Sequence, residues 1–267
     1  MLQMIGYGMA GAAGFSLGLI GGGGALLTIP ILVYGFGVPA VLGTGYSLFV
    51  VGATSLIGAI LAFRHRRVCF RTAAAFILPS LLAVFVSRTA VHRIPGSFRL
   101  PLIGEVGRDG FLMGLFGLAL IAAAISALRP ARPAQPGADS CAIRPVLAVL
   151  GLAVGALTGF FGAGGGFLIV PALTRWAGLP VEKAMGTSLV IVAANSWFGF
   201  SADMARGSGW DWPFVLGFTA ASLSGVFLGQ WANGRMRAAG LKQAFAWLTF
   251  SLGLFIFLKE LSQGVPS

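Results

Sequence analysis

The stretch of sequence that decides the fold is rich in glycine and occurs twice. Residues 14–30 read GFSLGLIGGGGALLTIP, and residues 155–171 read GALTGFFGAGGGFLIVP, at a constant offset of 141 residues. The match continues without a gap as far as Gly58, which aligns with Gly199. Self-similarity at a fixed offset is the sequence signature of a repeated structural unit. The chain is therefore predicted to contain two copies of one module.

The composition around these stretches indicates a membrane protein. Of 267 residues, 57% are hydrophobic and only 9% are charged, whereas an ordinary soluble domain has about 25% charged residues. The first charged residue is Arg64, so residues 1–63 are long enough for more than two crossings at about 20 residues each. The formal net charge is +11, but Lys and Arg fall almost wholly between the apolar segments, where they set membrane orientation. The lipid bilayer, and no nucleic acid, is the predicted partner.

The apolar segments predict an all-α, polytopic fold of two homologous repeats. Each repeat has a first element broken by glycines and three further spans. The expected units are 3–36, 39–63, 72–92 and 110–128, then 145–176, 180–203, 212–232 and 243–260. A Pro-rich, polar linker at 129–141 separates a first transmembrane repeat, 1–128, from a second, 142–267.

The first unit of each repeat sets the topology. A continuous helix of 34 residues would be about 50 Å long, against a hydrocarbon core of about 30 Å. If each half crosses four times, the repeats are parallel and Lys and Arg divide nine against nine between the two sides. If the first unit is a hairpin, each half crosses an odd number of times and the division is twelve against six. The charge bias favours inverted repeats with a cytoplasmic linker and both termini outside.

The glycine clusters are the candidate substrate site. Each glycine costs a helix about 1 kcal/mol relative to alanine, so both clusters are predicted to unwind the chain. Unwound backbone and a following helix N-terminus present N–H groups and a positive dipole, which suit an anion. The alternative is close helix packing. The candidate residues are Gly22, Gly23, Gly24, Gly164, Gly165 and Gly166.

Hydroxyl groups follow each cluster at the start of the next span. Thr44 and Ser47 follow the first cluster, and Thr187 and Ser188 follow the second. Hydroxyls can donate hydrogen bonds to an oxyanion without the desolvation penalty of a buried Lys or Arg. The alternative is that they bond to their own backbone. Asn195, about two turns further along, is a further candidate, with interhelical hydrogen bonding as its other role.

The paired glycine pattern, followed by an apolar stretch, Pro and Gly-Thr-Ser at 186–188, resembles the sulfite exporter TauE/SafE family of membrane permeases. The resemblance implies export or uptake of sulfite, sulfonates and related small sulfur or carboxylate anions. It covers nearly the whole chain. The first copy departs from the pattern, because Tyr46 stands where the second has Thr187. The two half-sites are therefore not expected to be equivalent.

An enzyme is the less favoured alternative. The segment Gly14–Gly18 matches the Gly-x-Ser-x-Gly pattern of serine hydrolases. The only histidines, His65 and His92, are expected in loops, and Ser16 aligns with Leu157 in the other half. No acidic residue follows the glycines as a dinucleotide site requires, and no phosphate-loop motif occurs. No catalytic, metal or cofactor site is predicted.

The seven carboxylates bear on transport coupling. All are expected in loops or at span ends, and Glu182 or Asp203 is the candidate relay. Without a relay the protein would be a uniporter or a channel, and if the glycines only pack it would be a scaffold. The expected function is a multi-pass permease of the cell inner (plasma) membrane for sulfite, an organosulfonate or a related sulfur oxyanion, with a carboxylate as the alternative substrate.

Overall fold

Helices make up most of the structure, a computed structural model that describes residues 2–20, 25–100, 104–128, 145–207, 209–233 and 238–263. The first half contains α1 (Leu2–Ile20), α2 (Ala25–Pro30), the π-helix η1 (Ile31–Gly35), α3 (Ala40–Arg64), α4 (Phe70–Arg93), β1 (Ser97–Leu100), β2 (Gly104–Gly107) and α5 (Arg108–Leu128). The second half contains α6 (Val146–Phe161), α7 (Gly166–Trp176), α8 (Val181–Met204), α9 (Trp212–Asn233) and α10 (Ala238–Gln263).

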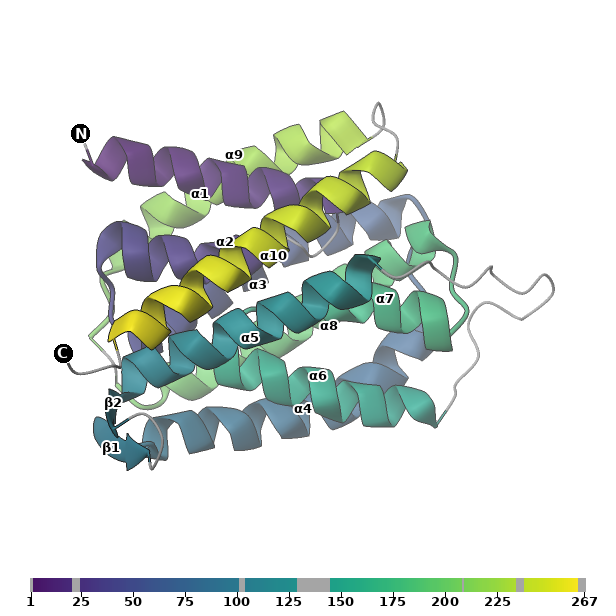
Figure 1. The fold of residues 1–267 in the computed structure, drawn as a ribbon. Helices are drawn as coiled ribbons and strands as arrows, with labels where there is room; N and C mark the ends of the chain where they lie inside the picture. Colours follow the sequence, from purple (N-terminus) through teal and green to yellow (C-terminus); the bar gives the residue numbers. More distant parts are fainter. Residues whose placement is uncertain are drawn as a thin grey trace.

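The first unit of each half is a helical hairpin. A Cβ on Gly6, near the start of α1, would lie 2.1 Å from the ring of Phe36, just after η1, so the chain has turned back to its starting end. In the second half, Leu147 at the start of α6 shares a core cluster with Leu173 and Ala177 at the end of α7. The two hairpins enter the molecule from opposite ends (Figure 1).

The longest elements of the two halves lie antiparallel at the centre. A Cβ on Gly45, near the start of α3, would lie 3.0 Å from Asp203 near the end of α8. A Cβ on Gly58, near the end of α3, would lie 3.1 Å from Leu189 near the start of α8. Around this pair, α1 packs along α9, α6 along α4 and α5 along α10. Both chain termini lie at one end of the bundle, and α6 begins at the other (Figure 1).

Glycines allow the outer helix pairs to pack closely. A Cβ on Gly14 of α1 would lie 1.8 Å from the carbonyl oxygen of Ser222 in α9. A Cβ on Gly155 of α6 would lie 2.3 Å from the carbonyl oxygen of Ser80 in α4. Small residues at such contacts let membrane helices approach backbone to backbone. Packing is therefore the role of these isolated glycines.

The outer surface is apolar along the helices. The side chains of Leu78 in α4, Leu228 in α9 and Phe255 in α10 are all more than half exposed. A soluble monomer rarely exposes so much apolar surface. Among the described residues, α3, α4, α5 and α9 are long and apolar enough to cross a membrane. The chain is a multi-pass, helical membrane protein.

The all-α fold class agrees with the prediction from the sequence. One short element is not predicted, because β1 and β2 pair as an antiparallel hairpin with Ser97 opposite Gly107. The expectation that His92 lies in a loop is wrong, because α4 continues to Arg93.

Candidate functional site

The second glycine cluster interrupts the chain between α6 and α7, as predicted. Gly162 ends α6 in a left-handed conformation with φ of 70°, and Gly164 and Gly165 also have positive φ, 65° and 68°. Three such residues within four positions are incompatible with a continuous helix. The chain resumes as α7 at Gly166, and the N–H groups of Leu168 and Ile169 in its first turn donate to the carbonyl oxygen of Gly165. The equivalent residues Gly22, Gly23 and Gly24 lie outside the described residues.

The break is packed against both apolar and polar groups. A Cβ on Gly164 would lie 2.6 Å from Val51 and 3.0 Å from Val192. A Cβ on Gly162 would lie 2.4 Å from the carbonyl oxygen of Thr44 in α3. A Cβ on Gly164 would lie 3.4 Å from Ser196 Oγ in α8, and one on Gly165 would lie 2.3 Å from Thr158 Oγ1 in α6. A side chain at these positions would therefore collide with the groups that surround the break.

Several buried side chains of α3, α6 and α8 have no hydrogen-bond partner among the described residues. They are Ser47 Oγ, Ser55 Oγ, Thr158 Oγ1, Asn195 Nδ2 and Ser196 Oγ. All five groups can donate a hydrogen bond, and none carries a charge. Thr158 and Ser196 adjoin the break directly. Buried polar groups in proteins are normally paired, so the two donors beside the break, Thr158 and Ser196, are free to bond to something other than the described residues.

The other predicted hydroxyls form hydrogen bonds within the protein. Thr187 Oγ1 accepts from the backbone N–H of Cys69 at 3.0 Å, and Ser188 Oγ donates to the carbonyl oxygen of Met185 at 2.8 Å. Asn195 Oδ1 accepts from Ser80 Oγ at 2.7 Å, which leaves its Nδ2 to donate elsewhere. The two halves thus differ, because Ser47 of the first half is unpartnered while Ser188 is bonded.

A buried ion pair next to the break was not predicted from the sequence. Arg88 in α4 is fully buried, and Asp203 in α8 is 2% exposed. Arg88 Nε donates to both carboxylate oxygens of Asp203 at 2.9 Å, and its Nη2 makes a further contact with Oδ2. Arg88 is thus an exception to the pattern in which Lys and Arg fall almost wholly between the apolar segments.

The same guanidinium contacts the elements around the glycine break. Arg88 Nη1 donates to Thr44 Oγ1 at 3.0 Å and to the carbonyl oxygen of Gly159 at 3.4 Å. Thr44 Oγ1 in turn donates to the carbonyl oxygen of Val41 at 2.7 Å. Because Gly162 packs on Thr44, this threonine connects the ion pair to the break.

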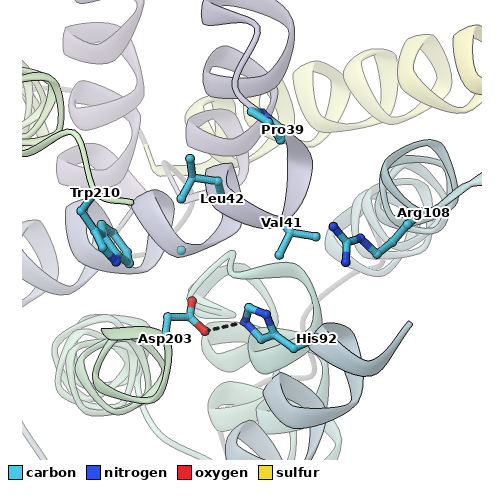
Figure 2. Close-up of a pocket in the computed structure, with 8 residues that line it drawn as sticks. Pro39, Val41, Leu42, His92, Arg108, Asp203 and Trp210 are labelled. Carbon is cyan, nitrogen blue, oxygen red and sulfur yellow. Dashed lines mark hydrogen bonds and ion pairs between the residues drawn. The ribbon is translucent and has the colours of Figure 1, made fainter. Parts of the chain in front are cut away.

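A cavity of about 240 Å³ adjoins this ion pair at the end of the bundle that carries the chain termini. His92 and Asp203 lie side by side in its wall, and Arg108 lies on another side (Figure 2). His92 Nε2 is 3.0 Å from Asp203 Oδ1, and the histidine side chain is 23% exposed. The indole N–H of Trp210, another lining residue, is buried and unpartnered among the described residues.

The spacing of residues along α4 could have placed Arg88 on the buried face of this helix. Residues four positions apart share one face of a helix, and the α4 residues Thr72, Phe76, Ser80, Val84 and Arg88 are all buried. The pairing partner is 115 positions away, in the other half of the chain. No local spacing connects the two.

The hypothesis of a serine hydrolase has no support at Ser16, because its hydroxyl donates to the carbonyl oxygen of Ala13 in its own helix at 2.8 Å.

Glu182, the other candidate relay, is exposed and lines a second cavity of about 250 Å³ between the end of α3 and the start of α8. The two cavities therefore lie at opposite ends of the central antiparallel pair.

Comparison with known proteins gives the family. The chain is 31% identical over 258 residues to a probable membrane transporter protein of Xylella fastidiosa, covering 95% of this chain and 94% of that protein. It is 27% identical to a probable membrane transporter protein of Haemophilus influenzae, covering 92% and 95%. No solved structure matches. The sulfite exporter TauE/SafE family model matches residues 7–256, and the chain belongs to this family of membrane transporters, which are not enzymes.

Proposed function

We propose that this chain moves a small sulfur oxyanion, sulfite or an organosulfonate, across the plasma membrane. The site is the break between α6 and α7 together with the polar side chains around it. The observation that carries the proposal is the group of five buried, uncharged donors without a partner among the described residues, two of which adjoin the break. Membership of a transporter family supports it.

The chemistry of the donors favours an oxyanion. A sulfite or sulfonate group presents three oxygens that only accept hydrogen bonds, which matches hydroxyl and amide donors. Neutral donors hold an ion weakly enough to release it, as transport requires. In this proposal Ser47 and Asn195 contact the anion with Thr158 and Ser196, while Thr187 and Ser188 hold neighbouring helices in place. Gly22, Gly23 and Gly24 would form the matching half-site.

We also propose that the halves, 1–128 and 142–267 with a linker at 129–141, are inverted repeats. Support comes from hairpins that enter from opposite ends and from three long helices in each half. It also comes from the packing, because α1 contacts α9 as α6 contacts α4, and α3 and α5 each pack against their counterparts α8 and α10. Alternating access in such proteins uses a site at the repeat interface.

The test is uptake of radiolabelled sulfite into proteoliposomes. Thr158→Val and Ser196→Ala each remove one hydroxyl with little change of volume. Each lost hydrogen bond is worth about 1 kcal/mol, so uptake at low sulfite should fall several-fold, up to roughly tenfold. The matched controls are Thr219→Val and Ser201→Ala, whose hydroxyls bond to their own helices. These controls should transport normally.

Three outcomes would contradict the proposal. Unchanged uptake in both folded variants would remove the break from the site. Competition by an excess of acetate as strong as by unlabelled sulfite would assign the protein to carboxylates. No uptake of any anion by the folded wild type, and no anion-dependent rise in its thermal stability, would leave a scaffold that does not transport.

A further inference from the structure

We propose that Arg88 and Asp203 form a proton-operated anion latch, which makes the protein a proton–anion cotransporter. In this mechanism, protonation of Asp203 frees the Arg88 guanidinium to bind the anion, and the two ions travel together. The inference rests on the proposed function, because it adds a coupling ion and a charged group to the same site.

The first support is the way in which Arg88 is neutralised. Three of its contacts go to one carboxylate, and the whole side chain is buried. Arginine keeps its proton in proteins, so only the carboxylate can change charge. While Asp203 is ionised, its oxygens occupy the guanidinium and would also repel an arriving anion. A buried ion pair contributes little net stability, and ionisable groups inside membrane proteins usually serve transport.

The second support is the position of the pair beside the break. Arg88 Nη1 already reaches Thr44 and the last turn of α6, which ends at the break. The guanidinium therefore needs no large movement to face an anion held by the unpartnered donors. Arginine can present two parallel N–H groups to a sulfonate, as it does to a carboxylate or phosphate.

The third support is a route for the proton. Asp203 and His92 both line the cavity of about 240 Å³, and their side chains are 3.0 Å apart (Figure 2). His92 is partly exposed and can pass a proton between the cavity and Asp203 Oδ1. The proton is taken from water in the cavity and returns to water on the other side once the anion has left.

The charges around Asp203 fit this cycle. The described charged or titratable groups that face it are Arg88 and His92 from α4 and Arg108 from α5; α3 contributes Thr44 to Arg88 and no charge. Among these described groups Asp203 is therefore the one anion, and the others are cationic or can become so. When Asp203 is protonated and a monovalent anion binds to Arg88, the net charge of this cluster stays the same. One anion therefore moves with one proton.

The probe is methanesulfonate, the anion of a strong acid, which cannot itself carry a proton across the membrane as bisulfite can. Proteoliposomes of the full chain enclose a pH-sensitive dye, and an inward methanesulfonate gradient is imposed with the membrane potential clamped. We expect internal acidification that matches labelled uptake. Uptake should rise as the external pH falls, up to about tenfold for each pH unit, because one proton moves with each anion.

Variants separate the latch from general damage. Asp203→Asn mimics the protonated carboxyl, so uptake should lose its pH dependence and its acidification, and methanesulfonate should raise the melting temperature of this variant more than that of the wild type. Arg88→Gln should abolish methanesulfonate binding. The matched control is Arg206→Gln, an exposed arginine bonded to Thr89 in the same region, which should keep normal coupling.

The failures are distinguishable. Methanesulfonate uptake by the wild type without acidification and without pH dependence would overturn the latch and leave the proposed transport intact. No uptake of methanesulfonate or sulfite would overturn both. If Asp203→Asn does not fold, the wild-type measurements still decide the matter, because they need no variant. Coupling that persists in Arg88→Gln would also overturn the latch.

Discussion

Arg88 reaches from α4 to groups on α3, α6 and α8, so one guanidinium connects four helices. Within the part of the chain that the structure describes, its charge is compensated by Asp203 alone, which also contacts His92. The two partners are therefore not equivalent. Loss of the carboxylate leaves a fully buried cation, whereas loss of the guanidinium leaves a carboxylate beside a histidine that can take up a proton.

Single variants of the pair should differ from the double variant in stability. Breaking a buried ion pair from one side costs about 3–5 kcal/mol, and replacing both members restores much of the loss. We expect Asp203→Asn to lower the melting temperature in detergent more than Arg88→Gln does. The double variant should melt above Asp203→Asn. A double variant that melts at the sum of the two single losses would show that the charges do not interact.

The break between α6 and α7 should tolerate no side chain at Gly165. A left-handed φ costs any residue other than glycine about 1–2 kcal/mol. Gly165→Ala adds a Cβ that would lie 2.3 Å from Thr158 Oγ1, whereas Gly178, with φ of 72°, has nothing within 4 Å. Thermal unfolding should therefore show a larger loss for Gly165→Ala than for Gly178→Ala. Sulfite uptake should fall in the first variant alone.

At the scale of elements, glycine also sets how closely whole helices pack. Gly155→Ala would push α6 away from the backbone of Ser80 in α4, at a cost of about 1–3 kcal/mol for overpacking. Gly8 lies in α1 with nothing within 4 Å, and Gly8→Ala should stabilise its helix by up to about 1 kcal/mol. Opposite shifts in melting temperature are the expected result. Equal shifts would mean that the α4–α6 contact is looser than described.

The sequence predicts the helical units well because each one depends on features within its own stretch of residues. Apolar runs of membrane length give α3, α5, α8 and α9, and the second glycine cluster gives the break between α6 and α7. The β1–β2 hairpin is missed because its strands have only four residues each, too few for a pattern of alternation to be distinguished from a loop. The ion pair is missed because Arg88 and Asp203 meet only when α4 and α8 of different halves pack together.

At the scale of the whole molecule, the central pair α3 and α8 separates two cavities. The one lined by His92 and Asp203 lies at the start of α3, and the one lined by Gln230 and Glu182 lies at its end. The two cavities differ in chemistry, since a histidine–carboxylate contact occurs in the first alone among the described residues. If the protein opened first toward one cavity and then toward the other, the site would be exposed alternately to the two sides of the membrane.

The inverted arrangement predicts the side of the membrane on which each end of the bundle lies. Between Ser97 and Ser262 the chain passes along α5, α8, α9 and α10, while the α6–α7 hairpin returns to the end at which it began. Four passages return the chain to the same side. Only α4 lies between Arg64 and Ser97, so Arg64 is on the opposite side.

Single cysteines at these three exposed positions test this arrangement, in a background without the two native cysteines. With both termini outside, a membrane-impermeant maleimide should label Ser97→Cys and Ser262→Cys in intact cells, and Arg64→Cys only after permeabilisation. The excess of Lys and Arg on the side of Arg64 assigns that side to the cytoplasm. Labelling of Ser97→Cys and Arg64→Cys from one side would mean that α4 does not cross. Labelling of Ser262→Cys from the side opposite to Ser97→Cys would give the second half an even number of crossings, and the repeats would then be parallel.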